Sequence, residues 1–394
     1  MAIDIGDSAI GRRRLVLRDT VSLLTILLVT AVLFACTLFL FRSFSTHRDE
    51  LAQRWSERGR RALQANRSQE AVADLRTALL YAPGNRAFEL LLAEALGQAG
   101  RTDESLNYFL GLWETMPGDG SINLSLARLA AQKGNRTDAV RYYRAAIDGT
   151  WEQGDGVERR AAVRAELAHY LIEQHDMQSA RMELLIAVGN SPDTYERDMT
   201  FGHLFEAAQD AKDAALYYEK ANALRPGDAE ALEAAGRLAY QASDYETAHR
   251  LLDRAADLRI PQHAPQAATD AELARSAARM MELNPAPSLP PGERVTRIVM
   301  IRSIARQRYE TCKDHTASQP TSPELQSLMA RWSDPDATSN RTTMLRDPAR
   351  QDAALNLAFD TERLMQQQCG AAAGDDALLL RLATAPKEGS APHV

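Results

Sequence analysis

The sequence predicts an all-α protein, in which an N-terminal transmembrane helix precedes an array of about six helical hairpins and a C-terminal helical extension. Alanine, leucine, arginine and glutamate dominate the composition, and these residues favour helices. An uncharged apolar run lies near the start of the chain, and prolines recur at a fixed interval further on. These three observations favour one extended repeat array over several globular domains in a chain of 394 residues.

The apolar run extends from Thr20 to Phe41 and contains no charged residue. At about 1.5 Å of rise per residue, a helix of this length crosses a hydrocarbon core of roughly 30 Å. A buried helix of a globular protein would carry a polar stripe, and this run has none. We therefore expect a short N-terminal tail at 1–19 and a transmembrane helix at 20–42 that contacts the lipid bilayer.

Three other interpretations of this run are open, namely a cleaved secretory signal, a lipoprotein signal at Cys36 and a twin-arginine signal at Arg13 and Arg14. The run is longer than a signal core and ends without a small-x-small cleavage site, which favours a retained anchor. Arginines flank both ends of the span, so the charge rule decides its orientation weakly. Because a short arginine-rich tail is costly to translocate, we expect a cytoplasmic N-terminus and a periplasmic repeat region. The alanine- and arginine-rich composition is typical of high-GC bacteria, so the expected location is a bacterial inner membrane.

A fixed period of 34 residues separates Pro83 from Pro117 and Pro192 from Pro226. Each period fits two helices and a turn, and proline marks the entry to the next hairpin because it cannot continue a helix. Glycine and alanine recur where the paired helices would touch. A glycine-rich insertion, WEQGDGVE, follows the third repeat. The six predicted repeats start at Ala52, Arg86, Gly120, Ala161, Tyr195 and Ala229.

This pattern resembles the tetratricopeptide repeat (TPR) family over residues 50–262. The resemblance implies a right-handed superhelix whose first helices (helices A) line a concave, protein-binding face. An unrelated helical bundle with alanine-rich interfaces is the alternative. Four aromatic residues occupy positions where such hairpins bury large side chains, so we interpret them as core residues: Trp55, Phe109, Tyr143 and Tyr218.

The same resemblance implies which side chains face the concave groove. The residues eight places after the six repeat starts are Arg60, Glu94, Arg128, His169, His203 and Arg237, and the apolar residues near them are Leu90, Leu124, Met199 and Tyr240. An apolar floor with mainly basic neighbours suits a peptide that carries some acidic residues, although a solvated inner face would give the same pattern. The two histidines occupy the same place in successive repeats, where they could respond to pH or bind a metal. Because helical spacing offers no third ligand, we predict no metal site and no cofactor.

The C-terminal third reads as a capping helix from Asp270 to Leu283 and a proline-rich linker, which together fill residues 263–293. Further helices are predicted near 294–312, 323–333, 348–369 and 375–384. They form a helical bundle over 294–384, followed by a disordered tail at 385–394. Isoleucines at three-residue spacing predict that the first of these helices packs along one face.

Three cysteines are too few for a disulfide framework. Cys312 and Cys369 end the first and third predicted C-terminal helices, which run parallel in an up-down-up arrangement. A disulfide between them would fit an oxidising periplasm, and two buried free cysteines would explain the sequence equally well.

The sequence contains no phosphate-binding loop, zinc-protease motif or nucleophile elbow. The net charge of −7 does not indicate nucleic-acid binding. We expect a non-enzymatic, membrane-anchored scaffold whose groove binds peptide segments of partner proteins in envelope assembly or quality control. In layout the chain is similar to TPR proteins of the Sec translocon, cytochrome c maturation and pilus assembly. The alternatives are a cytoplasm-facing adaptor of an envelope assembly complex, and an enzyme or ligand-binding activity in the C-terminal helices. The oligomeric state is left open.

Overall fold

The computed structural model describes residues 6–151, 156–316 and 322–385, and within these ranges it contains helices and turns but no strand. The chain forms two compact units, Met1–Ser191 and Pro192–Val394, each of which is described by itself. The all-helical fold class is therefore confirmed. The boundary between the units lies between the fourth and fifth predicted repeats, so the repeat region is divided between them.

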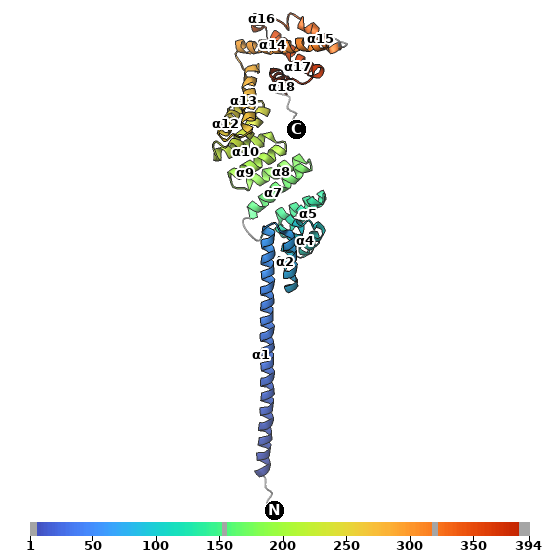
Figure 1. Cartoon of the computed structure of the whole chain (residues 1–394), viewed down its shortest axis with the longest axis vertical. Coiled ribbons are helices and arrows are strands. Elements are labelled where there is room, and N and C mark those ends of the chain that lie inside the picture. The colour runs from blue at the N-terminus through green and yellow to red at the C-terminus, as the bar shows by residue number, and fades with distance from the viewer. Residues whose placement is uncertain (1–5, 152–155, 317–321, 386–394) are drawn as a thin grey trace, which may run out of the picture. The chain divides into compact units, whose positions relative to one another are not determined.

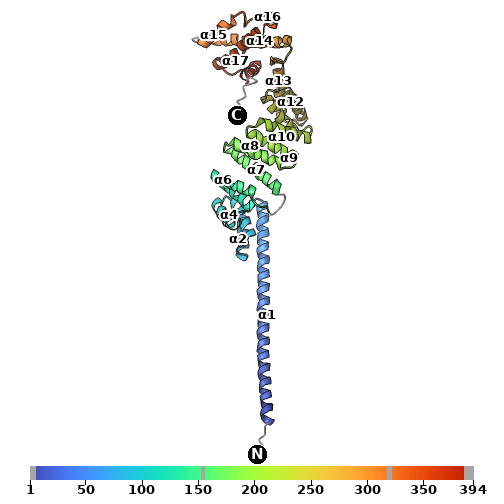
Figure 2. The same cartoon turned by 180° about the vertical axis from the view of Figure 1, so that it is seen from behind.

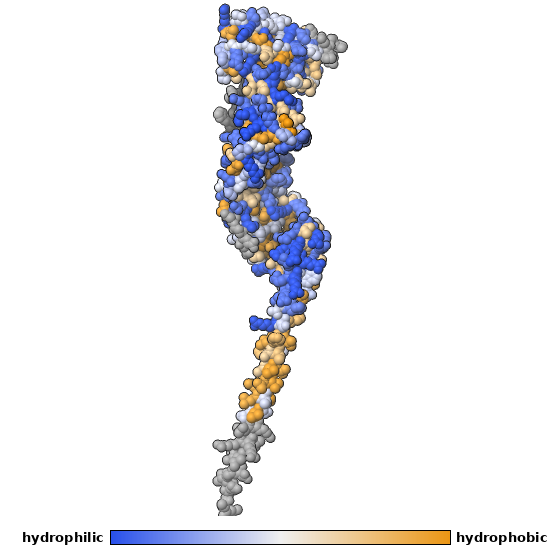
Figure 3. Space-filling model, turned by 60° about the vertical axis from the view of Figure 1, so that its left-hand side comes forward, coloured by the Kyte–Doolittle hydropathy of each residue, from blue (hydrophilic) through white to orange (hydrophobic). Residues whose placement is uncertain are grey.

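The first unit begins with one unbroken helix, α1, which runs from Gly6 to Gln64. Its end forms helix A of the first hairpin and packs beside α2 (Ser68–Tyr81), as Figure 1 shows. Within the expected span the apolar side chains are exposed, including Leu23 at 67% and Phe39 at 73%. Figure 3 shows this segment as a continuous orange band. α1 is long and apolar enough to cross a membrane, by length and composition.

The remaining hairpins of the first unit follow in chain order (Figures 1 and 2). They are α3 (Arg86–Gln98) with α4 (Thr102–Thr115), α5 (Gly120–Gln132) with α6 (Arg136–Asp148), and α7 (Gly156–Glu173) with α8 (Met177–Gly189). The second unit contains two more hairpins, α9 (Tyr195–Ala207) with α10 (Ala211–Leu224) and α11 (Ala229–Gln241) with α12 (Tyr245–Arg259). The six predicted hairpins are therefore all present.

In each hairpin the two helices cross at a small residue of helix A. These residues recur every 34 positions except across the insertion, and they are Gly59, Ala93, Ala127, Ala168, Gly202 and Gly236. A Cβ atom added at the first, fifth or sixth of these positions would lie within 2.8 Å of Leu75, Tyr218 or Leu252, respectively. In the second hairpin Ser105 replaces the usual alanine. Its buried hydroxyl donates to the Ala93 carbonyl at 2.7 Å, which satisfies the added polar group.

Every turn between helices A and B contains one residue in the left-handed conformation, with φ between 56 and 77°: Asn66, Gly100, Gly134, His175, Gln209 and Ser243. The residue after it caps helix B. In four hairpins the cap side chain accepts a hydrogen bond from a backbone N–H of the first turn, and these caps are Asn135, Asp176, Asp210 and Asp244. The left-handed residue therefore recurs in all six turns, and the capping hydrogen bond recurs in four of them.

The second unit continues with α13, from Gln266 to Leu283, which buries Ala274, Ala277 and Met280 against α12. A helix was predicted from Asp270 to Leu283, and the observed helix begins slightly earlier, at Gln266. Its role as a cap of the repeat array stays a prediction. The C-terminal helices are α14 (Pro291–Thr316), α15 (Pro323–Trp332), α16 (Arg341–Arg346), α17 (Pro348–Cys369) and α18 (Asp375–Thr384). Four of them match predicted helices, whereas no helix was predicted at the short α16.

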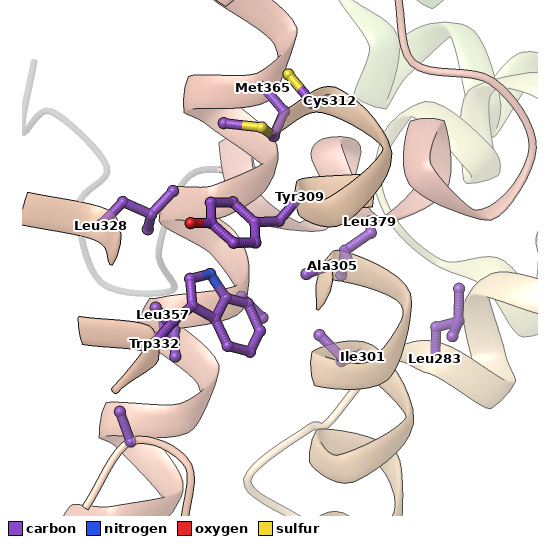
Figure 4. Packing of buried hydrophobic residues seen from close by; sticks show 12 residues of the cluster. Leu283, Ile301, Ala305, Tyr309, Cys312, Leu328, Trp332, Leu357, Met365 and Leu379 are labelled. Atoms are coloured by element: carbon purple, nitrogen blue, oxygen red, sulfur yellow. The ribbon is translucent and has the colours of Figure 1, made fainter. Parts of the chain in front are cut away.

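The C-terminal core lies along one face of α14, as the isoleucine spacing predicts. Ile301, Ala305 and Tyr309 are buried against α15, α17 and α18, and Val295 and Ile298 are buried against Met344 and Ala354. Figure 4 shows the Tyr309 ring beside the indole of Trp332, and their centroids are 5.9 Å apart. The expected disordered tail lies almost wholly outside the described residues.

Candidate protein-binding surfaces

The predicted inner-face residues of the first unit are accessible on successive A helices. Arg60, Glu94, Arg128 and His169 are exposed on α1, α3, α5 and α7, and Leu90 and Leu124 are half-buried. In the second unit His203 is exposed and Arg237 is half-buried. The structure therefore places eight of the ten predicted groove residues at the surface.

An ion pair between neighbouring A helices neutralises Arg128. Its guanidinium donates two hydrogen bonds of 2.7 Å to Glu166 on α7. The Tyr143 hydroxyl of helix B donates to the same carboxylate at 2.9 Å. Burial would raise the pKa of Glu166, but these bonds and the charge of Arg128 keep it below its ordinary value.

The second unit contains an equivalent network, in which the arginine pairs with a glutamate on the preceding A helix and not on the following one. Arg237 on α11 pairs with Glu206 on the preceding A helix, with an Nη2–Oε2 distance of 3.1 Å. The Tyr218 hydroxyl donates to Glu206 at 3.0 Å and lies 2.8 Å from Nδ1 of His203. The hydrogen bond from Arg237 holds the pKa of Glu206 below its ordinary value. Three of the four predicted core aromatics, Phe109, Tyr143 and Tyr218, are buried, which confirms the interpretation for these three. The fourth, Trp55, is half-buried and packs against a core cluster.

These pairs correct the expectation of a mainly basic groove. Arg60 also has a partner, because it pairs with Glu57 on its own helix. Arg54, Arg58, Arg60 and Arg61 border a hollow of about 760 Å³ between α1 and α3, and each pairs with an acidic side chain. The sequence shows the arginines of the inner face, but their partners occur at spacings that only the packed array brings together.

Two predicted groove residues are buried. Met199 is 7% exposed, and Tyr240 packs against Tyr245, with ring centroids 5.6 Å apart. α18 covers Tyr240: the Arg381 guanidinium lies 4.5 Å from its ring and donates to its carbonyl at 2.8 Å. The expectation that Tyr240 offers open apolar surface was wrong, because a helix distant in sequence returns to cover it.

The two histidines lie in different units. His169 lies 3.7 Å from Glu173 and His203 lies 3.7 Å from Glu230. Within the part of the chain that the structure describes, no group of three or more histidine, cysteine, aspartate or glutamate side chains could hold a metal ion.

An apolar hollow on the first unit lies between the second and third hairpins. It has a volume of about 440 Å³ and is lined by Arg86, Leu90, Leu112, Met116, Ile122, Trp151 and Arg159, among others. Only Leu90 was predicted. Trp151 belongs to the insertion after the third repeat, and Arg159 comes soon after it. The interruption of the 34-residue period was the signal that could have pointed to this hollow.

The C-terminal helices hold a separate cluster. Cys312 and Cys369 form a disulfide, with Cα atoms 5.9 Å apart. The adjacent Arg308 donates to Glu362 at 3.0 Å and to the Gly370 carbonyl at 3.1 Å. Burial and the charge of Asp376 raise the pKa of Glu362 to about 7, and Arg308 opposes that rise. These contacts tie α14 to the end of α17.

The hairpins define a helical-repeat protein. A 34-residue period, small residues at each crossing and a two-helix unit are the features of tetratricopeptide repeats, so the repeat region has the architecture of a TPR array. Compared by sequence, the chain matches no protein-family profile and no curated protein.

Compared by structure, the chain is similar to solved TPR proteins. YrrB, a TPR protein with an unusual peptide-binding site, is 17% identical, and the match covers 52% of this chain and 97% of YrrB with a TM-score of 0.39. PilW, a type IV pilus biogenesis factor, is 16% identical, with 56% and 97% covered and a TM-score of 0.42. The C-terminal part of a TPR protein from Cytophaga hutchinsonii is 12% identical, with 69% and 98% covered and a TM-score of 0.45. At these identities the likeness concerns the fold alone.

Proposed function

We propose that this chain is a non-enzymatic, membrane-anchored scaffold that binds peptide segments of partner proteins on the A-helix faces of its hairpins. The observation that carries the proposal is the continuity of α1. One helix contains both the exposed apolar segment and helix A of the first hairpin, in which Ala52 and Ala62 are buried. A membrane that holds the segment therefore also holds the hairpin.

The continuity of α1 also sets the distance between the membrane-spanning segment and the first hairpin. From Phe41 to Ala52 the helix rises about 16 Å at 1.5 Å per residue, with no turn between. The first hairpin would stand close to the membrane surface in a fixed orientation. This favours partners that are themselves membrane-bound or are crossing the membrane, as in the assembly or quality control of envelope proteins in the bacterial periplasm.

Thiol labelling tests the anchor and its orientation. Cys36 lies inside the span and the other two cysteines form the disulfide, so an Asn107→Cys variant supplies the one thiol expected to react in water. In intact cells, a membrane-impermeant maleimide should label this variant. Labelling only after the cells are lysed would place the hairpins in the cytoplasm. Recovery of the chain from the soluble fraction would contradict the proposal that α1 anchors it in a membrane.

Site-specific photo-crosslinking tests the binding face. A photoreactive residue at Leu124, on the inner face of α5, should capture envelope proteins, whereas the same group at Asn107 on helix B should not. Equal capture at both positions would contradict the assignment of the A-helix face. Tyr240 is unsuitable as a probe position because α18 covers it.

A further inference from the structure

We infer that the hollow between the second and third hairpins is a binding site for a peptide segment with a large apolar side chain next to a carboxylate. The inference rests on one part of the proposed function, namely that the chain binds segments of other proteins. The site differs from the general inner face of a hairpin array, because residues outside the repeat pattern build one wall of it.

The floor of the hollow is apolar and fixed. Leu112 and Ile122 are 3% and 1% exposed, and Leu90 and Met116 are half-buried beside them. A volume of about 440 Å³ lies in the range of pockets that hold small ligands, so it admits one large aliphatic or aromatic side chain. Burying such a side chain would be the main source of affinity.

The wall is formed by Trp151, which the start of α5 holds in place. Its indole Nε1–H donates to the Ala146 carbonyl at 3.2 Å. The indole occupies the space beside Gly120, where a Cβ atom would lie 2.4 Å from the ring. Backbone bonds of 2.8 Å from Gly120 N to Thr150 O and from Thr150 N to Gly118 O fix the segment before it. The wall is therefore preformed, and little conformational entropy is lost when a ligand binds.

Among the residues that the structure describes, no acidic side chain pairs with either of two cations at this hollow. Arg86 and Arg159 are exposed, whereas other arginines of the same unit, such as Arg128 and Arg136, pair with carboxylates. Arg159 lies 5.6 Å from the Trp151 ring.

Among the described residues that line the hollow, Asp119 is the one carboxylate, and it is already hydrogen-bonded. It accepts hydrogen bonds from the backbone N–H groups of Ser121 and Ile122 and from the Ser121 hydroxyl. These bonds hold the carboxylate at the start of α5 without neutralising it. The charges of Arg86, Arg159 and Asp119 together therefore leave the described lining of the hollow with a net positive charge.

An apolar pocket bordered by unpaired guanidinium groups selects a specific occupant. A cationic segment would be repelled, and a purely apolar one would leave both arginines unpaired. The complementary ligand carries its carboxylate beside the apolar side chain. That carboxylate can belong to an acidic side chain or to a chain terminus, since both present the same group to an arginine.

Fluorescence anisotropy of defined peptides with the full chain in detergent tests the site. The probes are glycine–serine peptides labelled at the N-terminus. The first contains Phe-Glu-Glu and an amidated end, the second Phe-Gln-Gln, the third Ala-Glu-Glu, and the fourth ends in phenylalanine with a free carboxylate. We expect the first to bind at least tenfold more tightly than the second and third. Tight binding of the fourth would identify a terminal carboxylate as a second source of the same group.

Two variants locate the binding. Arg159→Glu should weaken the Phe-Glu-Glu peptide at least tenfold. Arg250→Glu makes the same charge change at an exposed arginine of α12, far from the hollow in the sequence, and should leave binding unchanged. Because Arg159 is exposed, its replacement should not unfold the unit, and unchanged hydrogen exchange in α3–α5 verifies this.

Similar affinities for the first three peptides, or an unchanged affinity in the Arg159→Glu variant, would overturn the inference. Photo-crosslinking at Leu124 separates the two proposals. If Leu124 captures envelope proteins but the peptides do not bind, only this site is rejected. If both experiments fail, the scaffold function is rejected as well.

Discussion

The hairpins and the C-terminal helices are both wholly helical, yet different interactions hold them together. In the hairpins, small residues such as Gly59 and Gly202 recur at every crossing, and each contact resembles the next. The C-terminal helices have no period. The Cys312–Cys369 disulfide and the buried Arg308–Glu362 pair join α14 to α17 there. The difference teaches that the stability of the array is spread over many similar contacts, whereas that of the extension depends on a few.

The disulfide should carry the largest single effect. It closes a loop of 57 residues, which in the chain-entropy model stabilises the folded state by about 4 kcal/mol. Replacing both Cys312 and Cys369 by serine should therefore lower the protection of α14 and α17 against hydrogen exchange. Protection of α3–α6 should not change, and Cys36→Ser serves as the control without effect. Equal protection with and without the disulfide would show that packing alone holds the extension.

A large side chain at a helix crossing should have the next largest effect. Gly202→Leu places atoms where even a Cβ lies 2.6 Å from Tyr218, so we expect a loss of about 3 kcal/mol in the free energy of unfolding. Gly111 provides a matched control, because it is exposed on α4 with no atom within 4 Å of an added Cβ. Gly111→Leu should leave stability unchanged or raise it slightly. Urea unfolding of both variants measures the difference, and equal losses would contradict the role of the crossing.

The stability of the C-terminal helices should depend on pH in a way that the stability of the hairpins does not. Because burial raises the pKa of Glu362 to about 7, the folded state binds a proton more tightly than the unfolded chain. The resulting stability is complete below about pH 4.5 and is lost as the pH rises through 7. Between pH 5 and pH 8 we expect a loss of about 1–2 kcal/mol after allowing for screening.

Hydrogen exchange of α14 and α17 at both pH values, corrected for the intrinsic exchange rate, measures this loss. Glu362→Gln should remove most of the dependence, whatever its effect on absolute stability. A slope that the variant leaves unchanged would assign the dependence to other groups.

The smallest expected effect concerns the hairpin turns. His175 is exposed and adopts a left-handed conformation with φ of 59°, which costs a residue with a side chain roughly 1 kcal/mol. His175→Gly should relieve this cost and raise stability by about 0.5 kcal/mol, because glycine also loses more entropy on folding. Gly134, at the same place in the third hairpin with φ of 71°, is the reverse control. Gly134→Ala should destabilise, and thermal unfolding of the two variants should move in opposite directions.

Much of the architecture was predictable from local patterns. The 34-residue spacing located all six hairpins, and the spacing of Val295, Ile298 and Ile301 located the buried face of α14. Such signals are local, because a helical period or a proline at the first turn acts within a few residues. Leu90 and Leu124 were also placed on the accessible face by their position in the repeat alone.

Other features depended on contacts between residues far apart in the sequence. Glu166 neutralises Arg128 from the next A helix, Arg381 covers Tyr240 across 141 positions, and Trp151 builds a pocket wall from an insertion. The sequence by itself determined where helices form and which of their faces are apolar, because these depend on neighbours along the chain. Only the tertiary structure decided which charges remain unpaired and which apolar surface stays open, because packing brings those partners together.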